Sequence, residues 1–170
     1  MALAHLSGAT DEELRQGMAT FRGVERRFDF KLKSDRAVLL SDYAHHPAEI
    51  AQSIRSLRAL YEGRKLTVIF QPHLYTRTRD FYREFAESLS LADQVILTEL
   101  YPAREQPIPG VTSALIYDHL NPAIERQLTT KAELLNLLQQ DEKLDVVVVL
   151  GAGDLNDQVP EIAALLRQRV

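Results

Sequence analysis

The chain has 170 residues, 45% of them hydrophobic and 26% charged, which is typical of a single globular domain with a substantial core. Its net charge of −4 argues against the basic surface that nucleic-acid or anionic-membrane partners require. The lack of cysteine excludes disulfides and thiolate nucleophiles, and no apolar run has the length of a membrane span, so we expect a cytoplasmic protein.

The first expected element is a helix over residues 10–20. Thr10 and Glu13 have the spacing of a capping box, in which side chain and backbone bond reciprocally at a helix start. This helix has little before it to pack on. Residues 25–33 then predict an extended stretch, because they partly alternate and are rich in phenylalanine.

The rest of the chain alternates short apolar runs with helical patterns. The runs predict buried strands at residues 38–40, 66–70, 95–97 and 145–150. The helices are expected to begin at Pro47, at about Thr78, at Thr112, after the Thr130–Glu133 capping box, and after Gly153. This alternation predicts an α/β fold: a three-layer, Rossmann-like open sheet of about six mostly parallel strands, with helices on both faces.

Polar side chains follow the predicted strands, where open α/β sheets bind their ligands. They are Asp42, Tyr43, His45 and His46 after the first buried strand; His73, Tyr75, Arg77 and Arg79 after the second; Glu99 and Tyr101 after the third; and the turn 151–154 after the last. We therefore expect a functional site at this edge of the sheet.

Two interpretations of the histidines are open. Asp42, His45, His46 and His73 are of types that bind metal ions, so one hypothesis is a metal-dependent phosphoesterase. The alternative, which we favour, is that His46 caps a helix and His45 faces solvent, with no metal bound.

The second group is cationic. His73, Arg77 and Arg79 lie beside a helix start, which favours an anion, although Arg79 has potential partners in Asp80 and Glu84 on the helix surface.

Two further features are weaker indications of a binding site. The Gly151–Gly153 turn permits either close approach of a ligand or tight packing. The charged cluster of Arg22, Glu25, Arg26 and Arg27 offers an arginine to a phosphate, but the pattern does not choose which. No phosphate-binding P-loop is present, so the residues predict half of a binding site, and a non-catalytic nucleotide-binding module is a further alternative.

Together these segments resemble one family. The matching motifs, in order, are Phe21–Phe28, Asp42–Pro47 (DYAHHP), Gln71–Asp80 (QPHLYTRTRD), Tyr101–Glu105, Pro107–Gly110 and Gly151–Asp154. They resemble the C-terminal domain of the Mur ligases and, among these, the members that add L-alanine. The resemblance covers nearly the whole chain.

The resemblance implies an ATP-dependent, amide-forming ligase of peptidoglycan (cell wall) biosynthesis. It would join L-alanine to UDP-N-acetylmuramate through an acyl phosphate, with ATP and Mg²⁺ bound mainly by a central domain of the same polypeptide, which also has an N-terminal domain. Residues 1–23 would be the tail of the central ATP-binding domain and its linker, and residues 24–170 the C-terminal domain. The fragment alone would hold no complete catalytic set and would be inactive.

The resemblance also implies roles for single residues. Arg27 would reach the nucleotide phosphates and Asp42 the ribose. Tyr43, His45, His73 and Arg77 would line the pocket for the amino acid and the acyl phosphate, and no residue is assigned to a metal. Two positions depart from the family pattern: Ser41 stands where an acid is common, and Leu74 where some members carry arginine.

Overall fold

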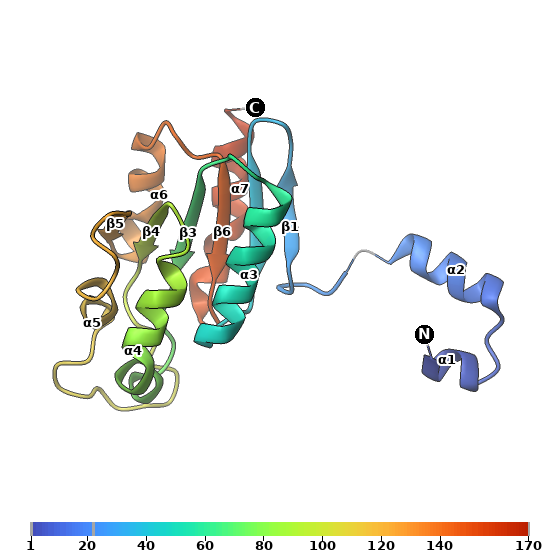
Figure 1. Ribbon diagram of the computed structural model, residues 1–170, viewed down its shortest axis with the longest axis horizontal. Helices are drawn as coiled ribbons and strands as arrows, with labels where there is room; N and C mark the ends of the chain where they lie inside the picture. The colour runs from blue at the N-terminus through green and yellow to red at the C-terminus, as the bar shows by residue number, and fades with distance from the viewer. Residues whose placement is uncertain (1, 22, 170) are drawn as a thin grey trace.

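A computed structural model describes residues 2–21 and 23–169 (Figure 1). Arg22, part of the charged cluster, lies outside them. The N-terminal helices α1 (Ala2–Leu6) and α2 (Asp11–Thr20) extend away from the sheet and bury none of their side chains. The expected capping box is present: the Glu13 carboxylate accepts the Thr10 N–H at 2.8 Å. Helix α1 was not expected.

The sheet has six strands in the order β1-β2-β6-β3-β4-β5. Only β1 is antiparallel to its neighbour, and all other pairs are parallel. The strands are β1 (Asp29–Lys33), β2 (Val38–Asp42), β3 (Leu66–Phe70), β4 (Gln94–Leu97), β5 (Glu125–Leu128) and β6 (Val146–Leu150). The predicted fold class is confirmed.

Helices cover both faces of the sheet, because alternate strand residues point to opposite sides. Helices α3 (Pro47–Leu60), α4 (Tyr75–Leu89) and α5 (Ser113–Tyr117) pack on one face, against side chains such as Leu40 and Phe70. The short 3₁₀ helix η1 (Asp154–Gln158), α6 (Lys131–Gln140) and α7 (Val159–Arg167) pack on the other, against Leu39 and Ile69. Among the helices described, none is long and apolar enough to span a bilayer.

Several boundaries differ from the expectation. Helix α4 begins at Tyr75 rather than near Thr78, because Leu74 at φ 74° turns the chain directly into the first turn. The region expected to be helical over residues 112–120 contains only α5 with Thr112 as its cap. Strand β5 was missed, because an exposed edge strand of sequence ERQL carries no apolar pattern.

The extended stretch 25–33 contains a strand only from Asp29 onward. The preceding residues form a turn closed by a Val24–Arg27 bridge, with Arg26 and Phe28 at positive φ. Phe81 in α4 is partly buried and packs against the core on its face of the sheet, and its backbone is non-helical at φ −125° and ψ 16°.

Candidate functional site

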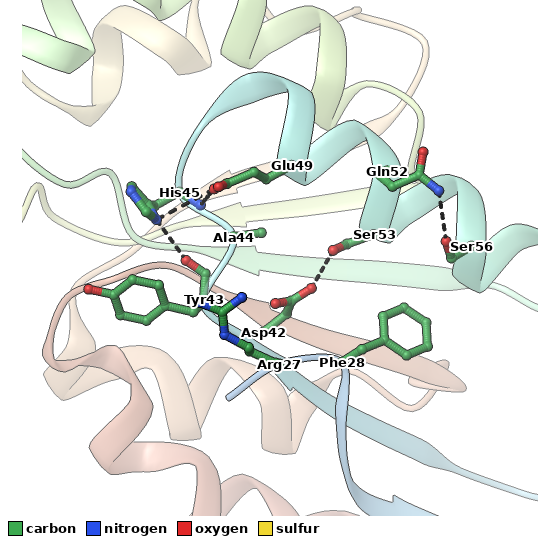
Figure 2. A pocket seen from close by; sticks show the side chains of 10 residues that line it. All are labelled: Arg27, Phe28, Asp42, Tyr43, Ala44, His45, Glu49, Gln52, Ser53 and Ser56. Atoms are coloured by element: carbon green, nitrogen blue, oxygen red, sulfur yellow. Dashed lines mark hydrogen bonds and ion pairs between the residues drawn. The ribbon is translucent and has the colours of Figure 1, made fainter. Parts of the chain in front are cut away.

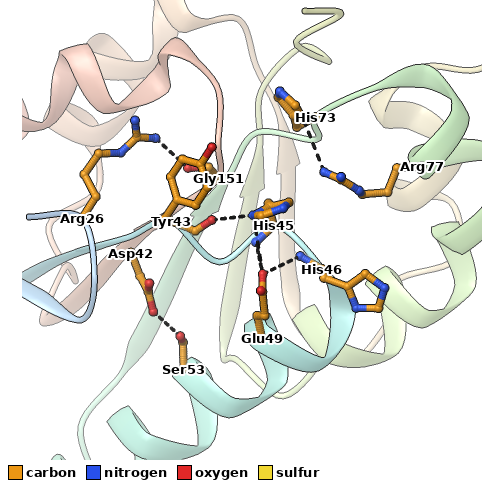
Figure 3. Close-up of polar contacts among 10 residues, drawn as sticks. All are labelled: Arg26, Asp42, Tyr43, His45, His46, Glu49, Ser53, His73, Arg77 and Gly151. Atoms are coloured by element: carbon orange, nitrogen blue, oxygen red, sulfur yellow. Dashed lines mark hydrogen bonds and ion pairs between the residues drawn. The ribbon is translucent and has the colours of Figure 1, made fainter. Parts of the chain in front are cut away.

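The side chains expected at the site gather where β2, β3 and β6 end. These ends are level, because Leu150 pairs with both Asp42 and Phe70. The residues that follow β2 and β3 therefore leave the sheet side by side, and Tyr43, His45, His73 and Arg77 lie in one region (Figure 3).

His45 is held in one tautomer by its neighbours. Its Nδ1 lies 2.9 Å from the carbonyl oxygen of Tyr43 and 3.5 Å from Oε2 of Glu49. Because both partners only accept, Nδ1 carries the hydrogen, and Nε2 of the neutral ring keeps its lone pair. The His45 side chain was expected to face solvent, but it is only 25% exposed.

Glu49 supports this arrangement from the first turn of α3. Its carboxylate accepts the backbone N–H groups of His45 at 3.0 Å and His46 at 3.2 Å. Burial opposes ionisation, but these N–H groups and the two imidazoles lower the pKa of Glu49 below its ordinary value. His46 is the N-cap residue of α3 as expected, but it contributes its backbone rather than its ring.

His73 lies between an aromatic ring and a guanidinium. Its ring stacks on Tyr101 at 5.7 Å between centroids, and Nδ1 is 3.3 Å from Nη1 of Arg77. Arginine can only donate, so Nδ1 accepts and the proton of neutral His73 sits on Nε2. Burial lowers the pKa of His73, and the charge of Arg77 and the proximity of His45 lower it further, against an opposing contribution from Glu105. At neutral pH this ring is uncharged.

The expected anion site at the start of α4 is already filled by the protein itself. Glu105, from the loop after β4, accepts the backbone N–H of Thr76 at 2.9 Å and also its hydroxyl. Those bonds to Thr76 hold the pKa of Glu105 below its ordinary value. Arg79 pairs with Asp80 at 2.7 Å on the surface. The cationic cluster is therefore reduced to Arg77, beside a neutral histidine.

An open pocket of about 470 Å³ adjoins this region, and Tyr43, His45 and Glu49 are part of its lining (Figure 2). Asp42, whose Oδ2 accepts the Ser53 hydroxyl, forms its floor. Arg27 and Phe28 form one wall, and polar residues of α3 form the other. Within residues 2–21 and 23–169, no hydrogen bond or ion pair engages the Arg27 guanidinium. A cation, a carboxylate and an aromatic ring around one pocket suit a nucleotide's phosphate, ribose and base.

Arg26, next to Arg27 in the chain, is held by contacts within the protein. Its guanidinium donates to the carbonyl oxygens of Gly151 at 2.9 Å and Gly153 at 3.3 Å, and lies 4.8 Å from the centre of the Tyr43 ring. A Cβ on Gly153 would fall 2.2 Å from Oε1 of Gln71. The turn after β6 is thus a packing turn, which was one of its two interpretations.

The phosphoesterase hypothesis needs Asp42, His45, His46 and His73 to converge, and they do not. Asp42 bonds to Ser53, and the ring of His46 lies 5.1 Å from that of Phe81. In the part of the chain that the structure describes, no three His, Cys, Asp or Glu side chains form a group that could hold a metal ion. The Mg²⁺ that the resemblance implies therefore has no fitting site on these residues.

Several contacts were missed by sequence reasoning. Glu49 and its partner His46 have the i, i+3 spacing of a helix start, which was a usable signal. Gln71 is 1% exposed and bonds Asp154 and the Leu155 N–H, linking β3 to the turn after β6. Glu105 and Thr76 are 29 residues apart, and no local pattern pairs them.

The chain is similar to known proteins over nearly its whole length. Residues 26–153 match the profile of the family described as Mur ligase, glutamate ligase domain. The chain is 63% identical over 169 residues to a UDP-N-acetylmuramate–L-alanine ligase of Phocaeicola vulgatus, and 52% identical over 170 residues to one of Parabacteroides distasonis. These alignments cover 99% and 100% of this chain, but 37% and 36% of the relatives, so the chain spans little more than a third of their length.

A solved structure of the same kind agrees. The UDP-N-acetylmuramate–alanine ligase of Thermotoga maritima superposes with a TM-score of 0.77 at 26% identity, over 99% of this chain and 36% of that one.

Proposed function

This chain belongs to the Mur ligase family, and we propose that it is part of an ATP-dependent ligase that joins L-alanine to UDP-N-acetylmuramate in peptidoglycan biosynthesis. The juxtaposition of two half-sites carries the proposal: a pocket at Arg27 and Asp42, and the His73–Arg77 pair, with His45 lining the pocket and lying next to His73. A ligase that activates a carboxylate with ATP and then transfers it to an amine needs the nucleotide and the amino acid next to each other.

Residues 24–170 would be the C-terminal domain of this enzyme, and residues 1–23 the end of a central domain with its linker. The absence of buried side chains in α1 and α2 supports this division, because helices usually bury one face. The central domain would hold the phosphates of ATP with Mg²⁺, and an N-terminal domain would bind the UDP-sugar. Such an enzyme would act in the cytoplasm, which supplies both nucleotides.

Each residue of the site has a role that suits its environment. The Arg27 guanidinium would meet a phosphate of ATP, and the carboxylate of Asp42 would accept hydrogen bonds from the ribose hydroxyls. Arg77 would bind the carboxylate of L-alanine, because a planar guanidinium holds a carboxylate bidentately. Tyr43, His45 and His73 would enclose the amino acid and the acyl phosphate.

This geometry supports a reaction completed by domain closure. The pocket at Asp42 is open to solvent and Arg77 is only partly buried in this chain, whereas an acyl phosphate must be kept from water until the amine attacks. A second domain closing over this edge of the sheet would exclude water and bring the activated carboxylate to the amine.

The test uses the full-length polypeptide that carries this chain. With ATP, Mg²⁺ and UDP-N-acetylmuramate, we expect L-alanine-dependent release of ADP and phosphate in equal amounts with the amide product, measured by mass spectrometry. The isolated chain should show no turnover and only weak ATP binding by calorimetry. Full activity with another nucleotide sugar but not with UDP-N-acetylmuramate would contradict the proposal, and tight ATP binding by the isolated chain would favour a nucleotide-binding module.

A further inference from the structure

An amino acid enters such a site with a protonated amine, which has no lone pair for attack. A group of the protein must therefore take a proton from it, and a general base of this kind has to lie within hydrogen-bond reach of the amine. Among the residues that the structure describes near Arg77, four groups are candidate proton acceptors: the imidazoles of His73 and of its neighbour His45, and the carboxylates of Glu105 and of Glu49, which lies against His45.

Three of these four groups are unsuited to the task. Nδ1 of His73 is occupied by the Arg77 guanidinium and its Nε2 carries the proton, so the neutral ring offers no free lone pair. Glu105 is bonded twice by Thr76, and Glu49 accepts two backbone N–H groups. Their lowered pKa values make both carboxylates weak bases.

His45 is different, because its lone pair is free. With Nδ1 donating to the Tyr43 carbonyl oxygen, Nε2 is the unprotonated nitrogen. The Glu49 carboxylate, 3.5 Å from Nδ1, would stabilise the positive charge that a proton on Nε2 creates. The His45 ring centre is 6.3 Å from that of His73, which bonds Arg77, so His45 and Arg77 flank the same neutral histidine (Figure 3).

We propose that Nε2 of His45 is the general base that deprotonates the incoming amino acid, with Glu49 as the positioning residue that orients the ring. This inference rests on the proposed function, since it needs an amine and an acyl phosphate at the site.

The reaction balances as follows. The ammonium group gives one proton to Nε2, and the freed lone pair forms the C–N bond at the acyl carbon. The C–O bond to the phosphoryl group breaks, and phosphate leaves with the bonding pair and the second amine proton. The third hydrogen stays on the amide nitrogen, and the imidazolium returns its proton to water.

The structural premise is tested on the chain itself. In ¹⁵N NMR spectra of histidine-labelled protein near pH 8, we expect His45 as the Nδ1–H tautomer and His73 as the Nε2–H tautomer. An Nε2–H tautomer at His45 would overturn the proposal, because the nitrogen facing the substrate would then be a donor.

The catalytic role is tested on the full-length polypeptide with His45→Asn, whose side-chain amide can replace Nδ1–H as donor to the Tyr43 carbonyl oxygen. Acyl-phosphate formation, measured by ATP cleavage, should fall much less than transfer to L-alanine. Transfer to L-alanine should fall by about 10²-fold or more, which is the usual contribution of a general base. Transfer to hydroxylamine should stay near the wild-type rate, because hydroxylamine is largely unprotonated at neutral pH.

Two further variants complete the experiment. Glu49→Gln should give a smaller loss with L-alanine alone, and His46→Gln, with its ring on the outer side against Phe81, should match the wild type. Equal losses with both amines in His45→Asn would show that His45 only positions the substrate, and would overturn the inference. A wild-type enzyme that forms no acyl phosphate would instead overturn the proposed function on which it rests.

Discussion

Nη1 of Arg77 donates to Nδ1 of His73 across 3.3 Å, one helical turn along the chain. Burial is the largest cause of the lowered pKa of His73, and the charge of Arg77 lowers this pKa further. The contact leaves the remaining donors of the guanidinium for a ligand. Because Glu105 already occupies the nearby helix start, Arg77 is the positive charge that a small carboxylate would meet there.

We predict that Arg77→Ala raises the KM for L-alanine in the full-length enzyme by about 10- to 100-fold, since hydrogen bonds to charged groups contribute about 1.5–3 kcal/mol. The KM for ATP should stay unchanged. Arg79→Ala is the matched control, because Arg79 is engaged by Asp80 on the surface. Wild-type alanine kinetics in Arg77→Ala would remove this residue from the amino-acid site.

The pKa of His73 should respond to its two charged neighbours. Burial is the largest cause of the lowered pKa, so removing charges changes it only in part. In Arg77→Gln the pKa should rise toward its ordinary value of 6.5, and in Glu105→Gln it should fall further. NMR titration of the isolated chain measures both. Shifts of the opposite sign would mean that these charges do not act on the ring as the geometry indicates.

The same shift predicts how stability depends on pH. Because the folded pKa of His73 lies below its unfolded value of about 6.5, the unfolded chain binds more protons in the window below that pH. The free energy of unfolding should therefore fall as the pH drops from about 6.5 through the folded pKa. Between pH 7 and pH 5, the Tm of the His73→Gln variant should fall by less than the Tm of the wild type. An identical loss in both proteins would assign the effect to other groups.

Substitution of Arg26 should affect the stability of the fold, whereas substitution of Arg27 should affect nucleotide binding. Arg26→Ala should lower the free energy of unfolding by about 1–3 kcal/mol, because two carbonyl oxygens of the turn after β6 lose their charged donor. Arg27→Ala should change it by less than about 0.5 kcal/mol, as for other exposed side chains, while weakening nucleotide binding in the full-length enzyme. Urea unfolding of both variants distinguishes them, and the reverse order would contradict the assignment.

Gly153→Ala tests the packing turn. The new Cβ would lie 2.2 Å from Oε1 of Gln71 and 2.9 Å from Tyr101, and we expect destabilisation of about 1–3 kcal/mol. Gly17→Ala in α2 is the matched control. Among the described residues, nothing beyond the backbone of its own helix and its chain neighbours lies within 4 Å of where that methyl group would stand, and alanine favours helices. Thermal unfolding should show a lower Tm for Gly153→Ala alone. Equal Tm values would mean that the turn relaxes to admit the methyl group.

The sequence was sufficient for much of this fold. Apolar runs identified four buried strands, and the N-cap threonines Thr10 and Thr130 placed the starts of α2 and α6, because both signals are local. Strand β5 was not predicted, because its pairing with β4 depends on backbone hydrogen bonds rather than on an apolar side-chain pattern.

The sequence predicted which residues lie at the site better than it predicted the contacts between them. The strand-end rule brought Asp42, His45, His73 and Arg77 to one edge, but could not foresee that Glu105 fills the start of α4 or that Glu49 orients His45. Both depend on tertiary or turn geometry. The choice between Arg26 and Arg27 likewise needed the positive φ at Arg26, which turns neighbouring guanidinium groups to different surroundings.

The level ends of β2, β6 and β3 have an evolutionary consequence. Leu150 pairs with Asp42 on one side and Phe70 on the other, so the two halves of the site are aligned through a strand that contributes none of their side chains. A one-residue insertion or deletion within β6 would shift this alignment and invert which valines face each helical layer. We expect length variation among homologues to accumulate in the loop of residues 101–110, and β6 to keep its length even where its valines are exchanged for other β-branched residues.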